Sequence, residues 1–182
     1  MKTMLLTISF LALVGCSMSV ISNTDGAGDP PASKTDSKMD HDPNVKGSPK
    51  RKDKVVLSDE EWKKRLTPAQ YKILRNHGTE AAFCGAFYDN HKTGVYHCAG
   101  CGLDLFKSDA KFDSGTGWPS FFQPAGKDNV WEREDNSYGM HRVEILCARC
   151  DGHLGHVFPD GPPPSRKRFC INSDALTFTE TK

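Results

Sequence analysis

The sequence lacks an excess of basic residues. Its 182 residues include 24 Lys and Arg against 23 Asp and Glu, for a net charge of +1. A nucleic-acid-binding domain normally carries a clear basic surplus or stripe, so this balance argues against nucleic acid as a partner. Short basic runs do occur, at 50–52 and 166–168, and such runs are typical of a solvated surface.

The chain also starts without an apolar run long enough to cross a bilayer, which takes about 20 residues. A shorter apolar run, 4–14, follows a basic start, and this order predicts a signal peptide over 1–15. The run leads into 13–16, LVGC, which resembles a bacterial lipobox, where cleavage precedes a cysteine that is then lipidated. A plain secretory signal with an incidental cysteine, or a buried first strand, is the alternative. We therefore expect an exported bacterial lipoprotein, periplasmic or on the cell surface, anchored to a membrane by Cys16.

Aromatic residues are absent from 17–54, a segment rich in Ser, Asp, Gly, Pro and Lys. Such a segment cannot bury enough apolar surface to offset the entropy that is lost on ordering. We therefore expect residues 16–54 to form a lipidated flexible tether that leads to one folded domain, 55–182.

The start of the expected domain carries two helix-start signals. Ser58 has Glu61 three residues later, which is the capping-box pattern. Thr67 and Pro68 give a second start, which Gly78 ends. Beyond it, Gly and Pro recur every few residues, and short runs predict strands at 94–97, 142–146 and 176–179. The sequence thus predicts a mainly β domain (α+β) with one or two short N-terminal helices.

Four of the seven cysteines form two C-x-x-C pairs, Cys98 with Cys101 and Cys147 with Cys150. Two residues between thiols let both sulfurs face one ion, and four thiolates around a tetrahedral ion make a closed, structural zinc site. Two disulfides, or redox-active C-x-x-C motifs, are the alternatives in an exported protein. The similarity of the two pairs favours a single structural Zn²⁺ bound by both.

Cys84 and Cys170 remain once Cys16 and the zinc ligands are assigned. They could form a redox couple, a structural disulfide, or two inert buried thiols. Arg168 and Asn172 each lie two residues from Cys170, so on a strand the three side chains share a face. A nearby guanidinium stabilises thiolate, the nucleophilic form, and the amide can hydrogen-bond a polar substrate. A mixed polar strand face would give the same pattern.

Two more segments offer chemistry. His153 and His156 stand three residues apart, and an imidazole can donate a proton near neutral pH. Two structural histidines or a second metal site would give the same pattern. Trp118 ends a glycine-rich turn and could hold a methyl group on sulfur, although a tryptophan in an aromatic cluster is also typical of a core.

Taken together and in this order, the segments resemble the methionine-R-sulfoxide reductase family (MsrB). The matching motifs lie at 77–80 (HGTE), 94–98 (GVYHC), 113–115 (DSG), 117–120 (GWPS), 153–161 (HLGHVFPDG) and 170–173 (CINS), and the likeness covers about 57–180. The resemblance implies two antiparallel β-sheets and a zinc ion, held by the four paired cysteines, that is distal to the active site. It implies Cys170 as the nucleophile and a pocket made by Trp118, which receives the substrate methyl, and by His153, His156, Arg168 and Asn172.

One position departs from the family pattern. Many members carry a resolving cysteine in a Gly-Cys-Gly-Trp context, where this chain has Thr116, which cannot form a disulfide. Cys84 instead resembles the resolving cysteine of members that place it on the earlier loop. The resemblance thus implies reduction of methionine-R-sulfoxide, mainly in proteins, through a Cys170 sulfenic acid that Cys84 resolves. A thioredoxin-like donor would then recycle the disulfide.

Two other functions stay open at the level of sequence. One is a zinc-pinned binding module without catalysis, which the polar flanks of Cys170 argue against. The other is a general disulfide oxidoreductase that uses Cys84 and Cys170. We also expect a monomer that contacts a membrane only through its lipid anchor.

Overall fold

The computed structural model of the chain describes residues 47–182. The expected signal peptide and Cys16 therefore lie outside the described residues. Among the helices of 47–182, none has the length and apolar character that a membrane span needs.

Two short helices, α1 (Asp59–Arg65) and α2 (Pro68–Leu74), stand at the start of the fold. Both begin with the predicted capping box. Ser58 Oγ accepts from the Glu61 backbone N–H while the Glu61 carboxylate accepts from that of Ser58, and the side chain of Thr67 likewise caps α2. Trp62 of α1 is 1% exposed, so the short helices are held by packing as well as by caps.

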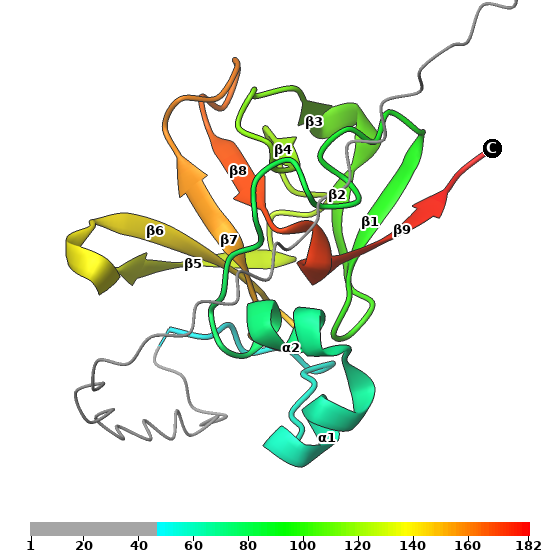
Figure 1. Ribbon diagram of the computed structural model, residues 1–182, viewed down its shortest axis with the longest axis vertical. Coiled ribbons are helices and arrows are strands. Elements are labelled where there is room, and N and C mark those ends of the chain that lie inside the picture. The colour runs from blue at the N-terminus through cyan, green and yellow to red at the C-terminus, as the bar shows by residue number, and fades with distance from the viewer. Residues whose placement is uncertain (1–46) are drawn as a thin grey trace, which may run out of the picture. The chain divides into compact units, whose positions relative to one another are not determined.

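The strands form two antiparallel sheets in the described part of the chain (Figure 1). One sheet has three strands in the order β2-β1-β9, and the other has six in the order β3-β4-β8-β7-β6-β5. The strands are β1 (Gly94–Cys98), β2 (Asp104–Lys107), β3 (Lys111–Phe112), β4 (Ser120–Phe121), β5 (Val130–Asp135), β6 (Arg142–Cys147), β7 (His153–Phe158), β8 (Arg168–Ile171) and β9 (Leu176–Glu180). Single 3₁₀ turns lie at Ser108–Ala110, Ser137–Gly139 and Ser173–Ala175. The predicted fold class, mainly β with two antiparallel sheets and two short helices, is confirmed.

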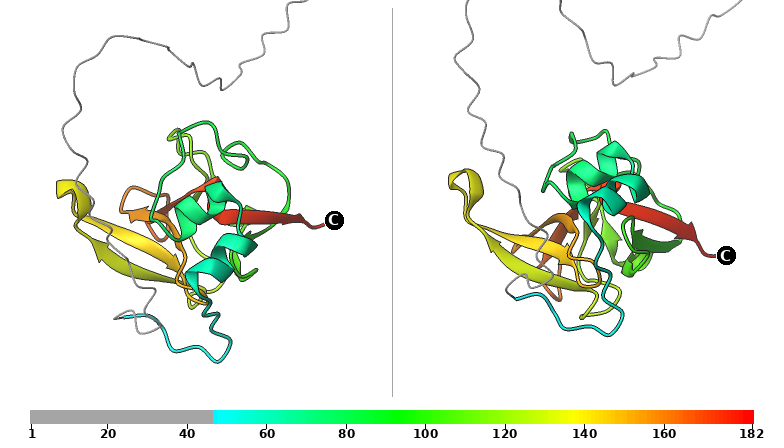
Figure 2. Two further views of the ribbon diagram at one scale, coloured as in Figure 1. Left: turned by 60° about the horizontal axis from the view of Figure 1, so that its bottom comes forward. Right: turned by 90° about the horizontal axis from the view of Figure 1, so that it is seen from below.

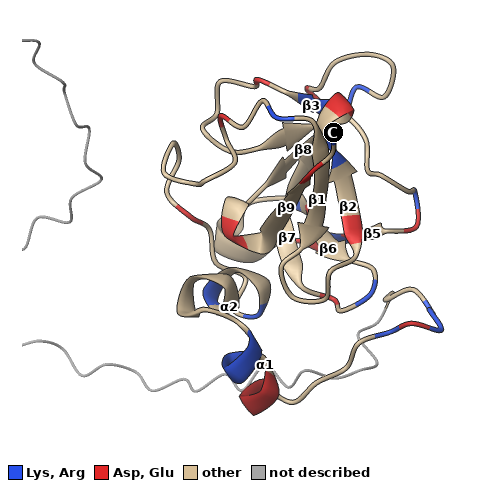
Figure 3. Ribbon diagram, turned by 90° about the vertical axis from the view of Figure 1, so that its right-hand side faces the viewer, with Lys and Arg blue, Asp and Glu red and all other residues tan. Residues whose placement is uncertain are grey.

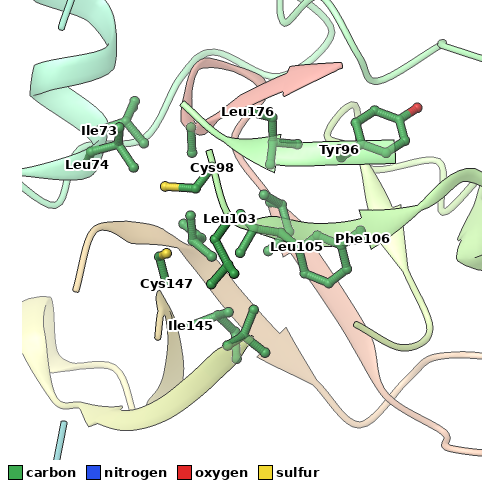
Figure 4. Close-up of a cluster of buried hydrophobic side chains, with 14 of the residues drawn as sticks. Ile73, Leu74, Tyr96, Cys98, Leu103, Leu105, Phe106, Ile145, Cys147 and Leu176 are labelled. Carbon is green, nitrogen blue, oxygen red and sulfur yellow. The ribbon is translucent and has the colours of Figure 1, made fainter. Parts of the chain in front are cut away.

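Buried aromatic and aliphatic side chains from both sheets and from α2 form one core (Figure 4). Phe106 of the smaller sheet stacks on Phe121 of the larger one, with ring centroids 4.4 Å apart. Tyr96 packs edge-on against Phe121 at 5.1 Å. Each such side chain contributes roughly 1.5–3 kcal/mol when it is fully buried, so this contact between sheets fixes how they are placed.

The β5–β6 hairpin extends beyond the rest of the larger sheet, as Figure 2 shows in yellow. Basic and acidic residues are interspersed along the ribbon in the view of Figure 3. This mixture is in keeping with the near-balanced composition.

The last residues of the expected tether contact the folded part. Lys54 Nζ donates to the Ala148 carbonyl at 2.9 Å and to the Asp151 carboxylate at 2.8 Å. Ser48 Oγ also donates to Asp151 at 2.8 Å. The same Asp151 oxygen also accepts from the Trp131 indole N–H at 3.0 Å. Ser48 and Lys54 lie within the expected tether, and both are hydrogen-bonded to the domain expected at 55–182.

Candidate active site and metal centre

The register of the larger sheet lines up five polar side chains across one face. The Cα partners run from Ser120 to Cys170, from Cys170 to His156, from His156 to Glu144 and from Glu144 to Arg133. Directly opposed residues of antiparallel strands project to the same face. The row therefore crosses β4, β8, β7, β6 and β5 with Cys170 and His156 side by side.

Gly155 allows β7 to approach β8 beside the nucleophile candidate. A Cβ at Gly155 would lie 2.0 Å from the carbonyl oxygen of Cys170, and its φ of 155° is one that L side chains rarely adopt. Only glycine fits this place in the HLGHVF strand. The close approach sets the pairing of His156 with Cys170.

Burial and two neighbours act in opposite directions on Cys170. The half-buried site raises the pKa of its thiol, because desolvation disfavours thiolate, while Arg168 and the Thr116 hydroxyl lower it. Arg168 forms a two-pronged ion pair with Asp160, with both N···O distances 2.9 Å, and it stacks 4.4 Å from the Phe158 ring centroid. The expectation that Arg168 stabilises thiolate is right in direction, but burial outweighs it.

Thr116 contacts Cys170 at the head of a chain of hydroxyl groups. Ser114 Oγ lies 2.8 Å from Thr116 Oγ1 and 2.7 Å from Ser120 Oγ. Ser120 is fully buried and is the β4 partner of Cys170. The residue that cannot supply a disulfide thus supplies a hydrogen bond to the thiol.

Trp118 enters β4 directly beside β8. The Pro119 carbonyl accepts from the Ile171 backbone N–H at 3.0 Å, and the indole Nε1 donates to the Glu80 carbonyl at 3.2 Å. Gly117 has a φ of 83°, and a Cβ there would lie 2.7 Å from the Phe83 nitrogen. The half-buried indole is therefore fixed next to the strand that carries Cys170.

Asn172 and Glu80 bind the end of β8 to the loop between α2 and β1. Asn172 is 3% exposed; its Oδ1 accepts from the Glu80 backbone N–H at 3.0 Å, and its Nδ2 donates to the Leu154 carbonyl at 3.0 Å. The Glu80 carboxylate accepts from the backbone N–H groups of Ser173 and Asp174 at 2.7 and 2.9 Å. The amide nitrogen of Asn172 carries two hydrogens, and the bond to Leu154 uses one of them.

Cys84 lies exposed on this same loop, which passes in front of β8 in Figure 1. The neighbouring Phe83 donates its backbone N–H to the Gly117 carbonyl at 2.8 Å. A Cβ at Gly85 would lie 2.3 Å from Ser173 Oγ, so the loop sits tightly on the turn after β8. The loop of Cys84 therefore contacts the turn before Trp118 and the turn after strand β8, which carries Cys170.

The two histidines use different ring nitrogens. His153, 1% exposed, donates from Nδ1 to Glu144 at 2.6 Å. His156 bonds Asp135 through Nε2 at 2.8 Å, and burial lowers its pKa. Their ring centroids lie 5.4 Å apart. A cleft of about 990 Å³ opens beside both rings and under the β5–β6 hairpin.

The four paired cysteines converge on one point between the sheets. Their sulfurs all lie within 4.8 Å of one another, with Cys98 to Cys150 at 3.6 Å and Cys101 to Cys147 at 3.5 Å. A disulfide needs about 2.05 Å, whereas ligands 2.3 Å from a tetrahedral zinc lie about 3.8 Å apart. The sulfurs thus fit a four-thiolate metal site. Figure 4 shows Cys98 and Cys147 in the same buried cluster as Leu74 and Leu103.

Comparison with protein-family models finds a match over most of the folded part. The model described as the SelR domain matches residues 66–180. The chain belongs to the SelR family. The matched segment contains every candidate catalytic, substrate-binding and metal-ligating residue named above.

Several curated relatives of the chain carry the printed name "Peptide methionine sulfoxide reductase MsrB". One from Bradyrhizobium diazoefficiens is 59% identical over 124 residues, covering 68% of this chain and 89% of the relative. One from Leptospira interrogans is 60% identical over 124 residues, covering 68% and 95%. One from the archaeon Methanosarcina barkeri is 59% identical over 124 residues, covering 68% and 87%.

In this SelR domain some of the predicted site residues share one face of the larger sheet, and others are held beside strand β8. Cys170, Arg168 and His156 share one sheet face, and backbone contacts hold Trp118 and Asn172 at the edges of the same strand. Sequence reasoning missed four carboxylates that hold these groups: Glu80, Asp135, Glu144 and Asp160. The available signal was a charge at an inward-facing strand position, as for Glu144, or within a named motif, as for Glu80 and Asp160.

Proposed function

We propose that this SelR domain reduces methionine-R-sulfoxide, mainly in proteins, with Cys170 as the nucleophile. The observation that carries the proposal is the position of Cys170 on the polar sheet face, paired with His156 and contacted by Arg168 and Thr116. The names of the relatives support the substrate class.

In the first step the Cys170 sulfur attacks the sulfoxide sulfur. Arg168 and Thr116 favour the thiolate that this attack needs, and His153 or His156, directly or through water, protonates the oxygen. The sulfoxide S–O bond breaks, the oxygen ends on Cys170 as a sulfenic acid, and methionine leaves. The Cys170 sulfur loses the two electrons that the methionine sulfur gains.

In the second step the Cys84 thiol attacks the sulfenic acid, which gives a Cys84–Cys170 disulfide and water. The exposed loop position of Cys84 supports this role, since the loop already contacts the turns on both sides of β8. A thioredoxin-like dithiol then reduces the disulfide by exchange and is itself oxidised.

Zinc is the metal that we propose for the four cysteine sulfurs, because four thiolates in two C-x-x-C pairs are typical ligands of a closed structural zinc site. The ion would crosslink the end of β1 in one sheet to the end of β6 in the other. Protein sulfurs fill all four positions, so zinc would supply stability and no chemistry.

The N-terminal segment gives this proposal its location. We propose cleavage after residue 15, lipid on Cys16 and a tether to the reductase domain, in an exported protein. Mass spectrometry of the exported form tests this directly. A mature chain that begins at Cys16 with the mass of a lipid is expected, whereas an unmodified Cys16 would refute the anchor.

The activity test compares both methionine sulfoxide epimers, free and in a peptide. The purified protein should reduce the R epimer alone, and Cys170→Ser should abolish the reaction. Cys84→Ser should complete one turnover and then stall with thioredoxin as the donor. Dithiothreitol is the control, because a small dithiol can reach the sulfenic acid and should restore cycling. Activity that survives in Cys170→Ser would overturn the assignment of the nucleophile, and unimpaired cycling of Cys84→Ser with thioredoxin would reject the resolving role.

A further inference from the structure

Glu144 is a buried carboxylate to which the proposed reaction gives no role. It is 4% exposed and stands in the polar row between His156 and Arg133. Its Oε1 accepts from Nδ1 of both His153, at 2.6 Å, and His77, at 2.7 Å. Its Oε2 accepts from the guanidinium of Arg133 at 2.9 and 2.7 Å.

The carboxylate stays ionised despite its burial. Desolvation alone would raise the pKa of Glu144, but the hydrogen bonds and charges of His153 and His77 outweigh it and hold that pKa well below its usual range. A buried carboxylate that lost these partners would be strongly destabilising. Four donor atoms are therefore arranged around one charge inside the sheet.

The same contacts decide which nitrogen of His153 is available. A carboxylate accepts hydrogen bonds only, so Nδ1 of His153 must carry a proton, and the ring is held in one tautomer. The opposite nitrogen, Nε2, is buried and has no hydrogen-bond partner within residues 47–182. A buried ring nitrogen left unsatisfied costs about 1–3 kcal/mol. His156, in contrast, already uses its Nε2 on Asp135.

We propose that Glu144 is a positioning residue that holds His153 with Nδ1 protonated and Nε2 directed to the sulfoxide oxygen. This inference rests on the proposed function and assigns the proton donor to His153. In the resting ring Nε2 carries no proton; it takes one up from the Cys170 thiol or from solvent, the carboxylate on Nδ1 stabilises the imidazolium that results, and Nε2–H then gives this proton to the oxygen. Glu144 acts through His153 and does not touch the substrate.

A metal ion does not fit this cluster as well as hydrogen bonds do. The ligand atoms of His77, Glu144 and His153 lie within 4.8 Å of one another. Yet each histidine nitrogen is only 2.6 or 2.7 Å from the shared Oε1. Ligands of one tetrahedral zinc at about 2.1 Å would lie about 3.4 Å apart. The distances are those of charge-assisted hydrogen bonds.

The first test needs no substitution. Long-range ¹H–¹⁵N NMR of the full mature chain reports which nitrogen of a neutral histidine carries the proton. His153 should be the Nδ1–H tautomer. A predominant Nε2–H tautomer overturns the proposal, whether or not the protein has reductase activity.

The second test is Glu144→Gln, which keeps the shape of the side chain and removes the charge. We expect kcat for the R epimer to fall on the order of 10- to 100-fold, with KM within about threefold, because the loss is of proton-donor alignment and not of substrate contact. The Nδ1–H tautomer of His153 should lose population in the same variant. A kcat within about twofold of the parent overturns the proposal.

Glu132→Gln is the matched control. Glu132 lies on β5 near the same hairpin, is exposed and pairs with Lys167 at 2.6 Å. The substitution Glu132→Gln removes the same charge as Glu144→Gln but contacts no histidine, so kcat and the His153 tautomer should stay as in the parent. If the parent itself reduces neither epimer, the proposed function fails, while the tautomer measurements still decide the positioning role.

Discussion

Thr116 gives the sharpest test of how Cys170 is activated. Thr116→Val replaces the hydroxyl by a methyl of similar volume and removes one of the two groups, beside Arg168, that lower the pKa of the Cys170 thiol. Ser114 keeps its 2.7 Å bond to Ser120, so the rest of the hydroxyl chain stays satisfied. The change therefore removes the bonds of Thr116 to Cys170 and to Ser114, and only the first of them touches the thiol.

The size of the effect follows from the strength of that bond. A hydrogen bond to a charged group contributes about 1.5 kcal/mol, and about 1.4 kcal/mol is a factor of ten in an equilibrium. Loss of the Thr116 hydroxyl raises the pKa of Cys170 further, so the thiolate population below that pKa should fall about tenfold. The single-turnover rate at neutral pH should fall by a similar factor.

Iodoacetamide measures the thiolate directly. In a Cys84→Ser background, alkylation of Cys170 is followed by mass spectrometry between pH 6 and 10, and the curve of Thr116→Val should lie at higher pH. Thr177→Val, an identical exchange on exposed β9, serves as the control and should leave the curve in place. Coincident curves for Thr116→Val and its parent would show that the hydroxyl does not stabilise the thiolate.

Three other positions test the metal centre, the strand packing and the arginine pair. Cys101→Ser should reduce bound zinc, measured by elemental analysis, from one equivalent to near zero. It should also lower the melting temperature by roughly 10 °C or more, since zinc binding is part of the folding free energy. Full metal content in the variant would contradict the four-sulfur site. Gly155→Ala should lower the urea midpoint by an amount worth about 1–3 kcal/mol, because its Cβ would meet the Cys170 carbonyl at 2.0 Å, and an unchanged midpoint would refute this packing. Asp160→Asn removes a carboxylate that raises the pKa of Cys170 and pairs with Arg168. The alkylation curve of Cys170 should therefore move to lower pH. A move to higher pH would show that Asp160 does not raise the pKa of the thiol.

Local rules were enough to predict the helices and the cysteine centre. A capping box is encoded within four residues, so Ser58 and Thr67 could be identified as helix starts before any tertiary contact was known. Each C-x-x-C pair is likewise a local turn, and only the joining of the two pairs needed the fold. The bonds of Lys54 could not be predicted in this way, because they go to a turn 94 and 97 residues away.

The polar row could not be read from the sequence, since it depends on strand order and register. His156 and Cys170 are neighbours only because β7 pairs with β8 in that alignment, and a slip of one residue would turn every side chain to the other face. Glu144 enters the same row through β6. In the sequence it is one charge in a short strand, and its four donors come from three separate segments.

The state of the nucleophile is a balance that no single neighbour decides. Arg168 lowers the pKa of the Cys170 thiol, as the sequence predicts. However, Asp160 forms two hydrogen bonds with the Arg168 guanidinium, and burial of the sulfur raises the same pKa. Without substrate the thiol form is therefore favoured, which protects Cys170 from oxidation because thiolate is the form that oxidants attack. In the proposed reaction Cys170 must therefore lose its proton when the sulfoxide binds. Protonation of the sulfoxide oxygen, as proposed for His153, would make the sulfoxide sulfur more electrophilic and so favour its bond to the Cys170 sulfur.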